Sequence, residues 1–154
     1  MTVRKPESGD KEEVVAMMTE FYSTDAVLRA VPRSNFEKTW AFLLPDGGRT
    51  VDAYLAEQNG KTVGYALLSL GWSNEAGGLT VWLEEIYIRP GFRGAGAGKQ
   101  LIARVFHDYG ERAVRFRLET EESNGGARRL YRSLGFHDLP YLQMVRDAAD
   151  AAEK

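Results

Sequence analysis

A glycine-rich stretch between an apolar segment and a helical pattern is the part of this sequence best suited to hold an anion. It reads RPGFRGAGAGKQL, from Arg89 to Leu101, with four glycines in eight residues. Because glycine has no Cβ, the backbone can approach a ligand closely, and consecutive N–H groups form a concave donor site. The helix that follows adds unpaired N–H groups and the positive end of its dipole. The alternative is a tight strand–helix turn that uses glycine for geometry alone, but so many glycines favour an anion site.

Two nucleotide-binding motifs do not fit this stretch. A P-loop needs a glycine five places before its Gly-Lys pair and Ser or Thr after it, but Arg93 and Gln100 stand there. A dinucleotide fingerprint needs its third glycine at Lys99 or at Leu101. An NTPase or a dinucleotide enzyme is therefore disfavoured, and the remaining pattern is Arg-x-x-Gly-x-Gly, from Arg93 to Gly98.

The composition indicates one soluble domain. The chain has 154 residues, of which 44% are hydrophobic and 11% aromatic, so it can build a core unaided. The absence of cysteine excludes disulfides, thiolate metal sites and cysteine nucleophiles, and it is compatible with a reducing cytoplasm. The N-terminus is too charged for a signal peptide, and no apolar run approaches the ~18 residues of a membrane span. We expect a single cytoplasmic domain over residues 1–146, a frayed tail over 147–154 and no membrane partner.

The charge is unevenly distributed along the chain. The formal net charge of −2 argues against nucleic acid as a partner. From Ile86 to Gly135, however, ten Lys/Arg stand against five Asp/Glu, so the glycine stretch lies in a basic part of the chain. On charge alone, solvated arginine-rich helix faces explain this as well as a functional site does. The His, Asp and Glu residues have no clustered spacing that indicates a metal.

The hydrophobic periodicity predicts an α/β (α+β) domain. Strands are expected at Val3–Lys5, Val51–Glu57, Thr62–Leu70, Leu79–Ile88 and Ala113–Thr120, with one or two closing strands within Phe136–Val145. Helices are expected at Lys11–Tyr22, Ser34–Leu44, Gly96–Tyr109 and Asn124–Leu134. Asn59-Gly60 is a strong two-residue hairpin signal. Hairpin-connected strands followed by β-α-β-α-β imply a mixed sheet with helices on its faces.

Two sequence elements, in the right order and at the right spacing, resemble the GNAT superfamily of acetyl-CoA-dependent N-acetyltransferases. The first is LEEIYIRPGFRGAGAGKQLI, which is a strand, then Gln/Arg-x-x-Gly-x-Gly/Ala, then a helix. The second, Asn-x-x-Ala-x-x-x-Tyr-x-x-x-Gly-Phe, occurs as NGGARRLYRSLGF. The resemblance covers Val51 to Val145 well, whereas the two N-terminal helices fit by position alone. The LEEIYI strand with the C-terminal tyrosine looks most like the diamine/polyamine acetyltransferase branch.

The resemblance implies the GNAT fold, with a mixed, mostly antiparallel sheet of six to seven strands and about four helices. It implies a splay between the Leu79–Ile88 and Ala113–Thr120 strands that holds the pantetheine arm of acetyl-CoA, the cosubstrate. Main-chain groups of Ile86 and Ile88 would pair with that arm, and N–H groups from Arg93 to Lys99 would bind the pyrophosphate. The residues so implied in cofactor binding are Ile86, Tyr87, Ile88, Arg93, Gly94, Ala95, Gly96, Ala97, Gly98, Lys99, Asn124, Ala127, Arg128 and Tyr131.

The same resemblance implies direct acetyl transfer, which needs a neutral amine and a proton source for the leaving thiolate. An alkyl amine has a pKa of ~10.4, so it arrives protonated at neutral pH. Glu84 or Glu85 would accept its proton through ordered water. Since successive strand residues point to opposite faces, we expect one of them to act and prefer Glu84, the family-equivalent position. Tyr131 would be the general acid toward sulfur, with core packing as the alternative.

The acceptor pocket would be acidic and aromatic. Trp72 is expected to line it with Glu84 and Glu85, with cation–π contact to the amine, while Trp72 in the core is the alternative. Glu20 and Asp25 would add negative charge if the N-terminal helices cover the pocket. His107 and His137 are interpreted as structural or exposed residues.

The sequence therefore favours an N-acetyltransferase that acts on a primary amine of a small molecule, such as a polyamine or an amino acid. The alternatives are a non-catalytic acyl-CoA-binding or sensor module, and acetylation of a protein or peptide amine. No metal is expected. Dimers are frequent in such families, and the resemblance points to Pro140–Val145 as the contact in a homodimer.

Overall fold

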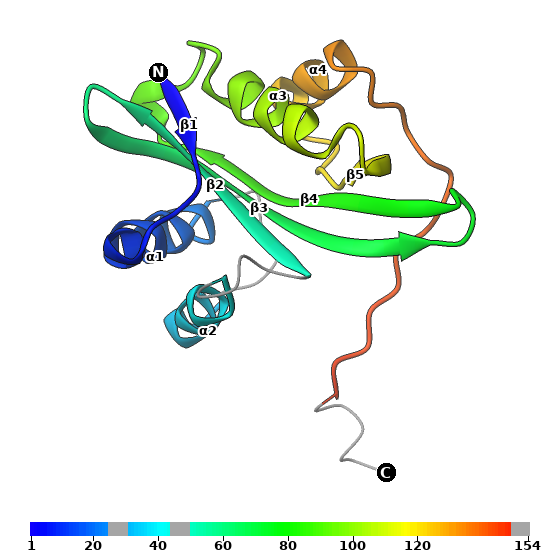
Figure 1. Ribbon diagram of the computed structural model, residues 1–154, viewed down its shortest axis with the longest axis horizontal. Helices are drawn as coiled ribbons and strands as arrows, with labels where there is room; N and C mark the ends of the chain where they lie inside the picture. The colour runs from blue at the N-terminus through cyan, green and yellow to red at the C-terminus, as the bar shows by residue number, and fades with distance from the viewer. Residues whose placement is uncertain (25–30, 44–49, 149–154) are drawn as a thin grey trace.

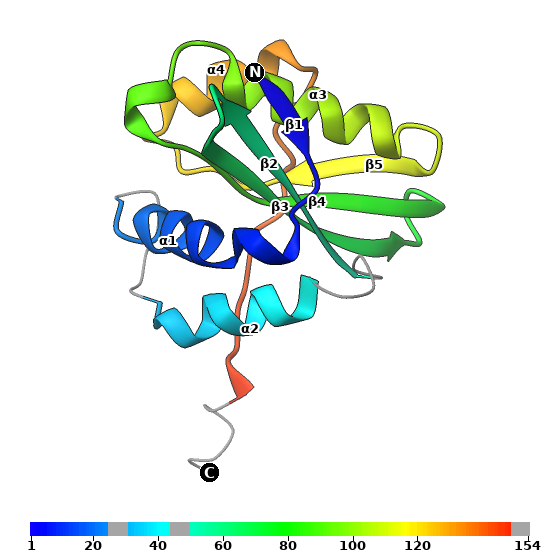
Figure 2. The same cartoon turned by 60° about the vertical axis from the view of Figure 1, so that its left-hand side comes forward.

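A five-stranded sheet forms the centre of the computed structural model, which describes residues 1–24, 31–43 and 50–148. The strands lie in sequence order, and every neighbouring pair is antiparallel except the parallel last one. Figures 1 and 2 show the sheet as a twisted layer between helices. The strands are β1 (Thr2–Arg4), β2 (Val51–Gln58), β3 (Lys61–Ser73), β4 (Gly78–Ile88) and β5 (Ala113–Leu118).

Two helices cover each face of the sheet in the described part of the chain (Figure 1). One face carries α1 (Lys11–Phe21) and α2 (Arg33–Leu43), and the other carries α3 (Ala97–Tyr109) and α4 (Gly125–Ser133). Each face has its own apolar cluster, because side chains alternate between the two faces of a strand. The expected helix end at Leu44 and residues 149–154 of the expected tail lie outside the described residues.

The hairpin prediction between β2 and β3 is confirmed. Asn59 has φ of 53° and Gly60 has φ of 72°, the left-handed backbone that the primed two-residue turns require. Two short 3₁₀ helices, η1 (Ser8–Asp10) and η2 (Pro90–Phe92), precede α1 and follow β4. The Asn59-Gly60 turn sets how β2 and β3 are paired at this end of the hairpin.

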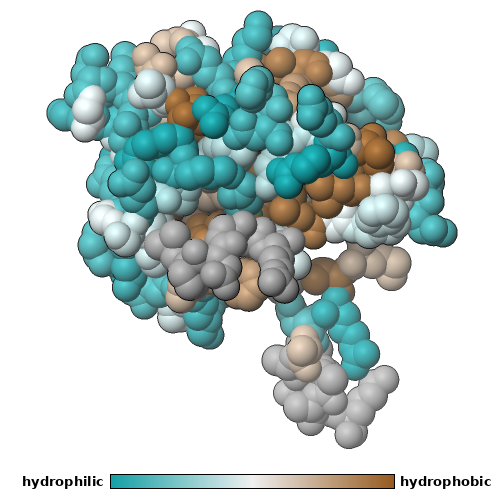
Figure 3. Space-filling model, viewed as in Figure 1, coloured by the Kyte–Doolittle hydropathy of each residue, from teal (hydrophilic) through white to brown (hydrophobic). Residues whose placement is uncertain are grey.

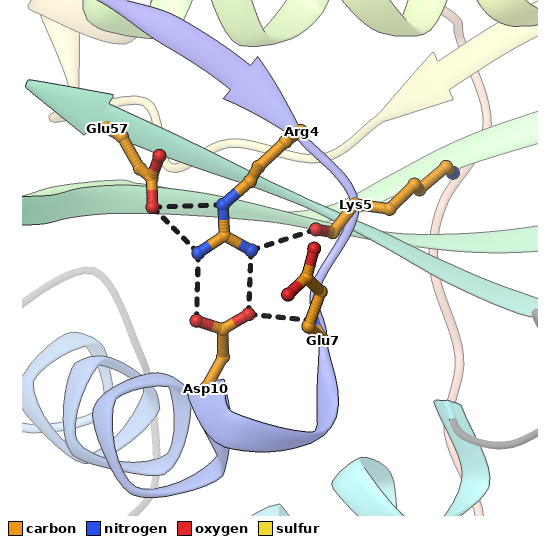
Figure 4. A network of polar contacts seen from close by, with 5 residues as sticks. All are labelled: Arg4, Lys5, Glu7, Asp10 and Glu57. Carbon is orange, nitrogen blue, oxygen red and sulfur yellow. Dashed lines mark hydrogen bonds and ion pairs between the residues drawn. The ribbon is translucent and has the colours of Figure 1, made fainter. Parts of the chain in front are cut away.

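The three-residue strand β1 is held by the guanidinium of Arg4, which lies between two carboxylates (Figure 4). Arg4 donates to both oxygens of Asp10, at 2.7 and 2.9 Å, and to one oxygen of Glu57, at 2.9 and 2.7 Å. Asp10 precedes α1 and Glu57 lies on β2, so one side chain connects three elements. A bidentate arginine–carboxylate pair fixes geometry as well as charge.

The prediction of six to seven strands is wrong at the C-terminal end. In the described part of the chain, residues 136–148 form no strand, and β5 is an edge of the sheet. The segment runs from α4 past the β3–β4 hairpin and away from the body of the protein (Figure 1). Leu142 and Met144 are each 95% exposed. Figure 3 shows mainly hydrophilic helix surfaces, and its largest apolar area lies at the level of the sheet.

Candidate active site

The turn between β4 and α3 presents backbone N–H groups without helical partners. Gly94 and Gly96 have φ of 79° and 84°, the left-handed region that favours glycine. Gly96 caps α3, and the first N–H bonded back to it is that of Gln100, at 3.0 Å. The N–H groups of the three preceding residues, from Ala97 to Lys99, therefore need another partner. With the positive helix end behind them, they suit a phosphate.

Arg93 closes the start of this turn onto β4. Its Nε donates to the carbonyl of Ile88 at 2.7 Å, and its N–H donates to the carbonyl of Pro90 at 3.3 Å. Its guanidinium carbon lies 5.8 Å from the centroid of the Tyr87 ring. One lone pair of the Ile88 carbonyl is thus occupied within the protein, and the N–H of Arg93 is not among the free donors.

The sheet opens between β4 and β5. The two strands pair from Leu79, opposite Ala113, to Leu83, opposite Leu118. Beyond Leu83, β4 continues to Ile88 and keeps its pairing with β3. Its other edge has no partner strand in the described residues. This open backbone edge, which leads directly to the glycine turn, has the form expected for a site that binds an extended ligand.

A β-bulge interrupts β4 where the two strands part. Leu67 lies opposite Glu85, and Leu68 lies opposite Leu83. Glu84 is therefore an extra residue without an opposite partner on β3. A bulge bends its strand and changes the direction of a side chain, and here it acts on one of the two candidate carboxylates.

The bulge brings Glu84 and Glu85 to the same face of the sheet. Glu84 accepts a hydrogen bond from the hydroxyl of Ser69 at 2.5 Å, and Glu85 accepts one from the hydroxyl of Tyr65 at 2.6 Å. Ser69 and Tyr65 are four residues apart on one strand, so their side chains share a face. The expectation that the two carboxylates point to opposite faces is wrong, because it assumed regular alternation without a bulge.

The two carboxylates differ in their surroundings. Glu85 is only 9% exposed and accepts hydrogen bonds from the hydroxyls of Tyr65 and Tyr22, the second at 2.8 Å. Burial raises the pKa of Glu85, the tyrosine donors lower it, and the nearby charge of Glu84 raises it further. Glu84 itself is exposed.

A cleft of about 1000 Å³ lies where these elements meet. Tyr22 and Phe21 at the end of α1 form one wall, Glu84 on β4 and Leu118 on β5 form another, and α4 contributes Tyr131. Glu85 is not among the lining residues, because Tyr22 covers it. The exposed candidate base and the candidate acid therefore face a common space.

Tyr131 enters the cleft from α4. Its ring packs edge-on against Phe136 with centroids 6.0 Å apart, and burial raises the pKa of the Tyr131 phenol. It is partly buried rather than enclosed in the core. Among the described residues no hydrogen-bond partner of its hydroxyl is found. The ring is thus fixed by packing, and the hydroxyl can donate to a ligand.

The start of α4 places the other residues of the second motif. The side-chain oxygen of Asn124 accepts from the N–H of Ala127 at 3.2 Å, which makes Asn124 the helix N-cap. The cap leaves the amide NH₂ for another contact. Arg128 lines the cleft, and its guanidinium lies 3.9 Å from Asp138 and donates to the Glu122 carbonyl at 3.4 Å.

Two predicted residues lie elsewhere, and a third is outside the described part of the chain. Trp72 is 76% exposed near the end of β3, beyond the last pairing with β2, and it does not line the cleft. Glu20 accepts hydrogen bonds from Arg89 and from Tyr87, so its charge is engaged. Asp25 lies outside the described residues.

Both histidines are exposed, as the sequence interpretation allowed. His107 is exposed and lies 3.0 Å from Asp108, and His137 is exposed at the rim of the cleft. Among the described residues, no three His, Asp or Glu side chains are grouped in a way that could hold a metal ion. No helix in those ranges has the length and apolar character that a membrane crossing needs.

Sequence reasoning missed Phe21, Tyr22 and Ser69. The two aromatic residues end a helix whose spacing predicts core packing, and Phe21 does pack on Tyr87 with centroids 6.0 Å apart. Ser69 is the one polar residue in the run YALLSL, and that isolated hydroxyl was the available signal.

Comparison with known proteins agrees with this geometry. Residues 14–136 match the acetyltransferase (GNAT) family. Thialysine N-epsilon-acetyltransferase of Sus scrofa is 36% identical over 78 residues, which is 50% of this chain and 45% of that protein. The chain thus spans slightly under half the length of this curated relative.

Solved structures share the fold over nearly the whole chain. An integron cassette protein from a salt-marsh metagenome is 26% identical, with a TM-score of 0.75 over 95% of this chain and 90% of that one. An aminoglycoside N-acetyltransferase, AAC(6′)-Iy in complex with CoA, has a TM-score of 0.76 at 20% identity and covers 96% of this chain and 94% of that one. At that identity the likeness concerns the fold alone. The family match over most of the chain, together with the glycine turn, the open β4 edge and the shared fold, shows that this protein belongs to the GNAT acetyltransferase family.

Proposed function

We propose that the protein is an enzyme that transfers an acetyl group from acetyl-CoA to a primary amine of a small molecule, by direct transfer in a ternary complex. The observation that carries this proposal is the open β4 edge, which joins the donor-rich glycine turn to a cleft shared by Glu84 and Tyr131. The residues fit the cosubstrate chemically. Free N–H groups suit a pyrophosphate, and an unpaired strand edge suits the amides of a pantetheine arm.

In the proposed reaction the amine nitrogen attacks the thioester carbonyl, and the carbon–sulfur bond breaks. Glu84 accepts the proton of the ammonium group through ordered water, so that a neutral amine attacks. Tyr131 donates its proton to the departing sulfur, since a phenol and an alkyl thiol have similar proton affinities. The second proton that the amine nitrogen loses passes through water to the Tyr131 phenolate and restores the phenol. No covalent enzyme intermediate forms, and the chain has no cysteine to carry one.

For the acceptor we propose a small cationic amine. Glu84 and the ring of Tyr22 on the cleft wall offer a negative charge and an aromatic face, both of which stabilise an ammonium group. The thialysine enzyme among the relatives is named for acetylating the N-epsilon amine of thialysine. A protein or peptide amine is the alternative acceptor.

An assay of free thiol release with acetyl-CoA and a panel of diamines, amino acids and peptides tests this function. Turnover with a small amine supports it. Stabilisation of the protein by CoA without turnover of any amine would instead indicate a non-catalytic acyl-CoA sensor.

We further propose that the protein forms a homodimer through the segment around Pro140–Val145 and acts in the cytoplasm. Leu142 and Met144 are exposed apolar side chains that do not line the cleft, and β5 is an unpaired sheet edge. Light scattering on the wild type and on Met144→Asp tests the dimer. A monomeric wild type would exclude it.

A further inference from the structure

Ser69 holds an unusual place on β3. It is half-buried and lies among leucines at positions 67, 68 and 70, so its hydroxyl is a polar group in an apolar strand. Its hydroxyl donates to Oε1 of Glu84 at 2.5 Å. Glu84 is the bulge residue and has no opposite partner on β3. The Ser69 side chain thus gives Glu84 a contact with β3 that the backbone register does not provide.

A bulged residue on an open strand edge needs such a contact to have a defined direction. Beyond Leu83 the sheet gives Glu84 no neighbour on the β5 side, and the carboxylate is exposed to the cleft. A glutamate with three side-chain torsions would otherwise sample many rotamers. One hydrogen bond to Oε1 restricts the carboxylate to fewer rotamers and leaves Oε2 to accept from water or substrate.

The adjacent carboxylates of Glu84 and Glu85 differ in their hydrogen-bond donors and in their exposure. Glu85 has two tyrosine donors and lies behind Tyr22, whereas Glu84 has one short donor and lies in the cleft. The same face of β3 therefore supplies one holder for each carboxylate, Tyr65 for the buried one and Ser69 for the exposed one.

We propose that Ser69 is a positioning residue that holds Glu84 for proton acceptance from the acceptor amine. This inference rests on the proposed function. Ser69 touches neither the amine nor the thioester. It acts through Glu84, by keeping one carboxylate oxygen aimed at the reacting centre.

Steady-state kinetics of three variants test the effect on turnover. Ser69→Ala should lower kcat about tenfold and leave the KM for acetyl-CoA unchanged, since a hydrogen bond to a charged group is lost away from the cosubstrate. Ser69→Thr keeps the hydroxyl and should restore much of the rate. Ser73→Ala, on the same strand face with its hydroxyl bonded to the Ala76 N–H, is the matched control and should behave as wild type.

A double-mutant cycle separates positioning from general structural damage. In a Glu84→Gln background, Ser69→Ala should cost no further rate, because its effect passes through Glu84 alone. An equal loss in both backgrounds, or no loss in either, overturns the proposal.

A direct measurement keeps the proposal independent of turnover. The side-chain carboxyl ¹³C resonance of Glu84, assigned by its absence in Glu84→Gln, should move in Ser69→Ala and return toward its wild-type position in Ser69→Thr. An unchanged Glu84 resonance in Ser69→Ala would exclude the Ser69–Glu84 hydrogen bond and with it the proposal. A moved resonance in a protein that turns over no amine would exclude the proposed function while leaving the Ser69–Glu84 contact established.

Discussion

The hydroxyl of Tyr22 lies 2.8 Å from Oε1 of Glu85, and the same residue lines the cleft that Glu84 enters. Tyr22 thus separates two adjacent carboxylates into different environments. On one side a carboxylate faces solvent, and on the other a carboxylate is buried in the apolar layer under α1 and α2. The difference predicts different roles, with Glu84 in proton transfer and Glu85 in the packing of the site.

Glu85→Gln should raise stability at neutral pH. Burial raises the pKa of Glu85 above its ordinary value of 4.5, so the folded state favours the neutral acid. Its contribution to stability is full below pH 4.5 and is lost as pH rises through the raised pKa. We expect the variant to melt at a higher temperature than wild type at pH 7.5, with no difference at pH 4. Thermal unfolding at several pH values measures this, and a variant less stable at every pH would contradict it.

Glu84→Gln should impair turnover and leave cosubstrate binding intact. General-base catalysis contributes at least ~100-fold, so kcat/KM for the amine should fall by about that factor at pH 7. The loss should shrink as the pH approaches the amine pKa of ~10.4, because the amine is then largely neutral and needs no base. A pH–rate profile checks this. Glu75→Gln, which alters an exposed carboxylate paired with Arg115, is the control and should follow the wild-type profile.

Tyr131→Phe should lower kcat much more than it changes the KM for acetyl-CoA. The ring packing on Phe136 is kept, and only the hydroxyl is lost. Because burial raises the pKa of Tyr131, the phenol stays protonated at neutral pH and can act as an acid. Initial-rate kinetics with both substrates give the split. A rise in KM at constant kcat would assign Tyr131 to binding.

Gly96→Ala should weaken cosubstrate binding. Its φ of 84° is strained for any residue with a Cβ, and the strain falls on the turn that presents the N–H groups. We expect about a tenfold loss in CoA affinity by calorimetry, from the ~1–3 kcal/mol cost of such a backbone. Gly9→Ala is the control, since a Cβ there meets nothing within 4 Å. Unchanged affinity in Gly96→Ala would exclude the turn as the anion site.

The features that the sequence predicted well are those that short motifs encode. Glycine at 94, 96 and 98 between an apolar run and an amphipathic one predicts a strand, a donor-rich turn and a helix, and Asn59-Gly60 predicts its hairpin. At Asn59, Gly60, Gly94 and Gly96 the backbone is left-handed, a conformation that few other residue types adopt. Local chemistry then decides the structure.

The bulge and the last strands were beyond the reach of such patterns. The consecutive residues Glu84 and Glu85 break the alternation of LEEIYI, but the register shift itself is defined only by the pairing of β4 with β3. The segment around Pro140 carries apolar residues, but a strand also needs a partner, and proline removes one of the N–H donors. The place of Tyr22 in the cleft wall was not predicted, for a related reason. Tyr22 has the spacing of a core residue, but it lies at the boundary between the core and the cleft.

The packing of the glycine turn on α4 has a consequence for which thioesters react. A Cβ on Gly98 would lie 3.4 Å from Leu130, the residue before Tyr131, so the backbone of α3 lies directly against the helix that carries the acid. The span from the anion-binding turn to the phenol is therefore fixed by two packed helices. With a fixed span, only a thioester whose arm reaches from the anion-binding turn to Tyr131 can react. A phosphate-bearing thioester with a shortened arm should compete with acetyl-CoA for binding and yet remain unreacted.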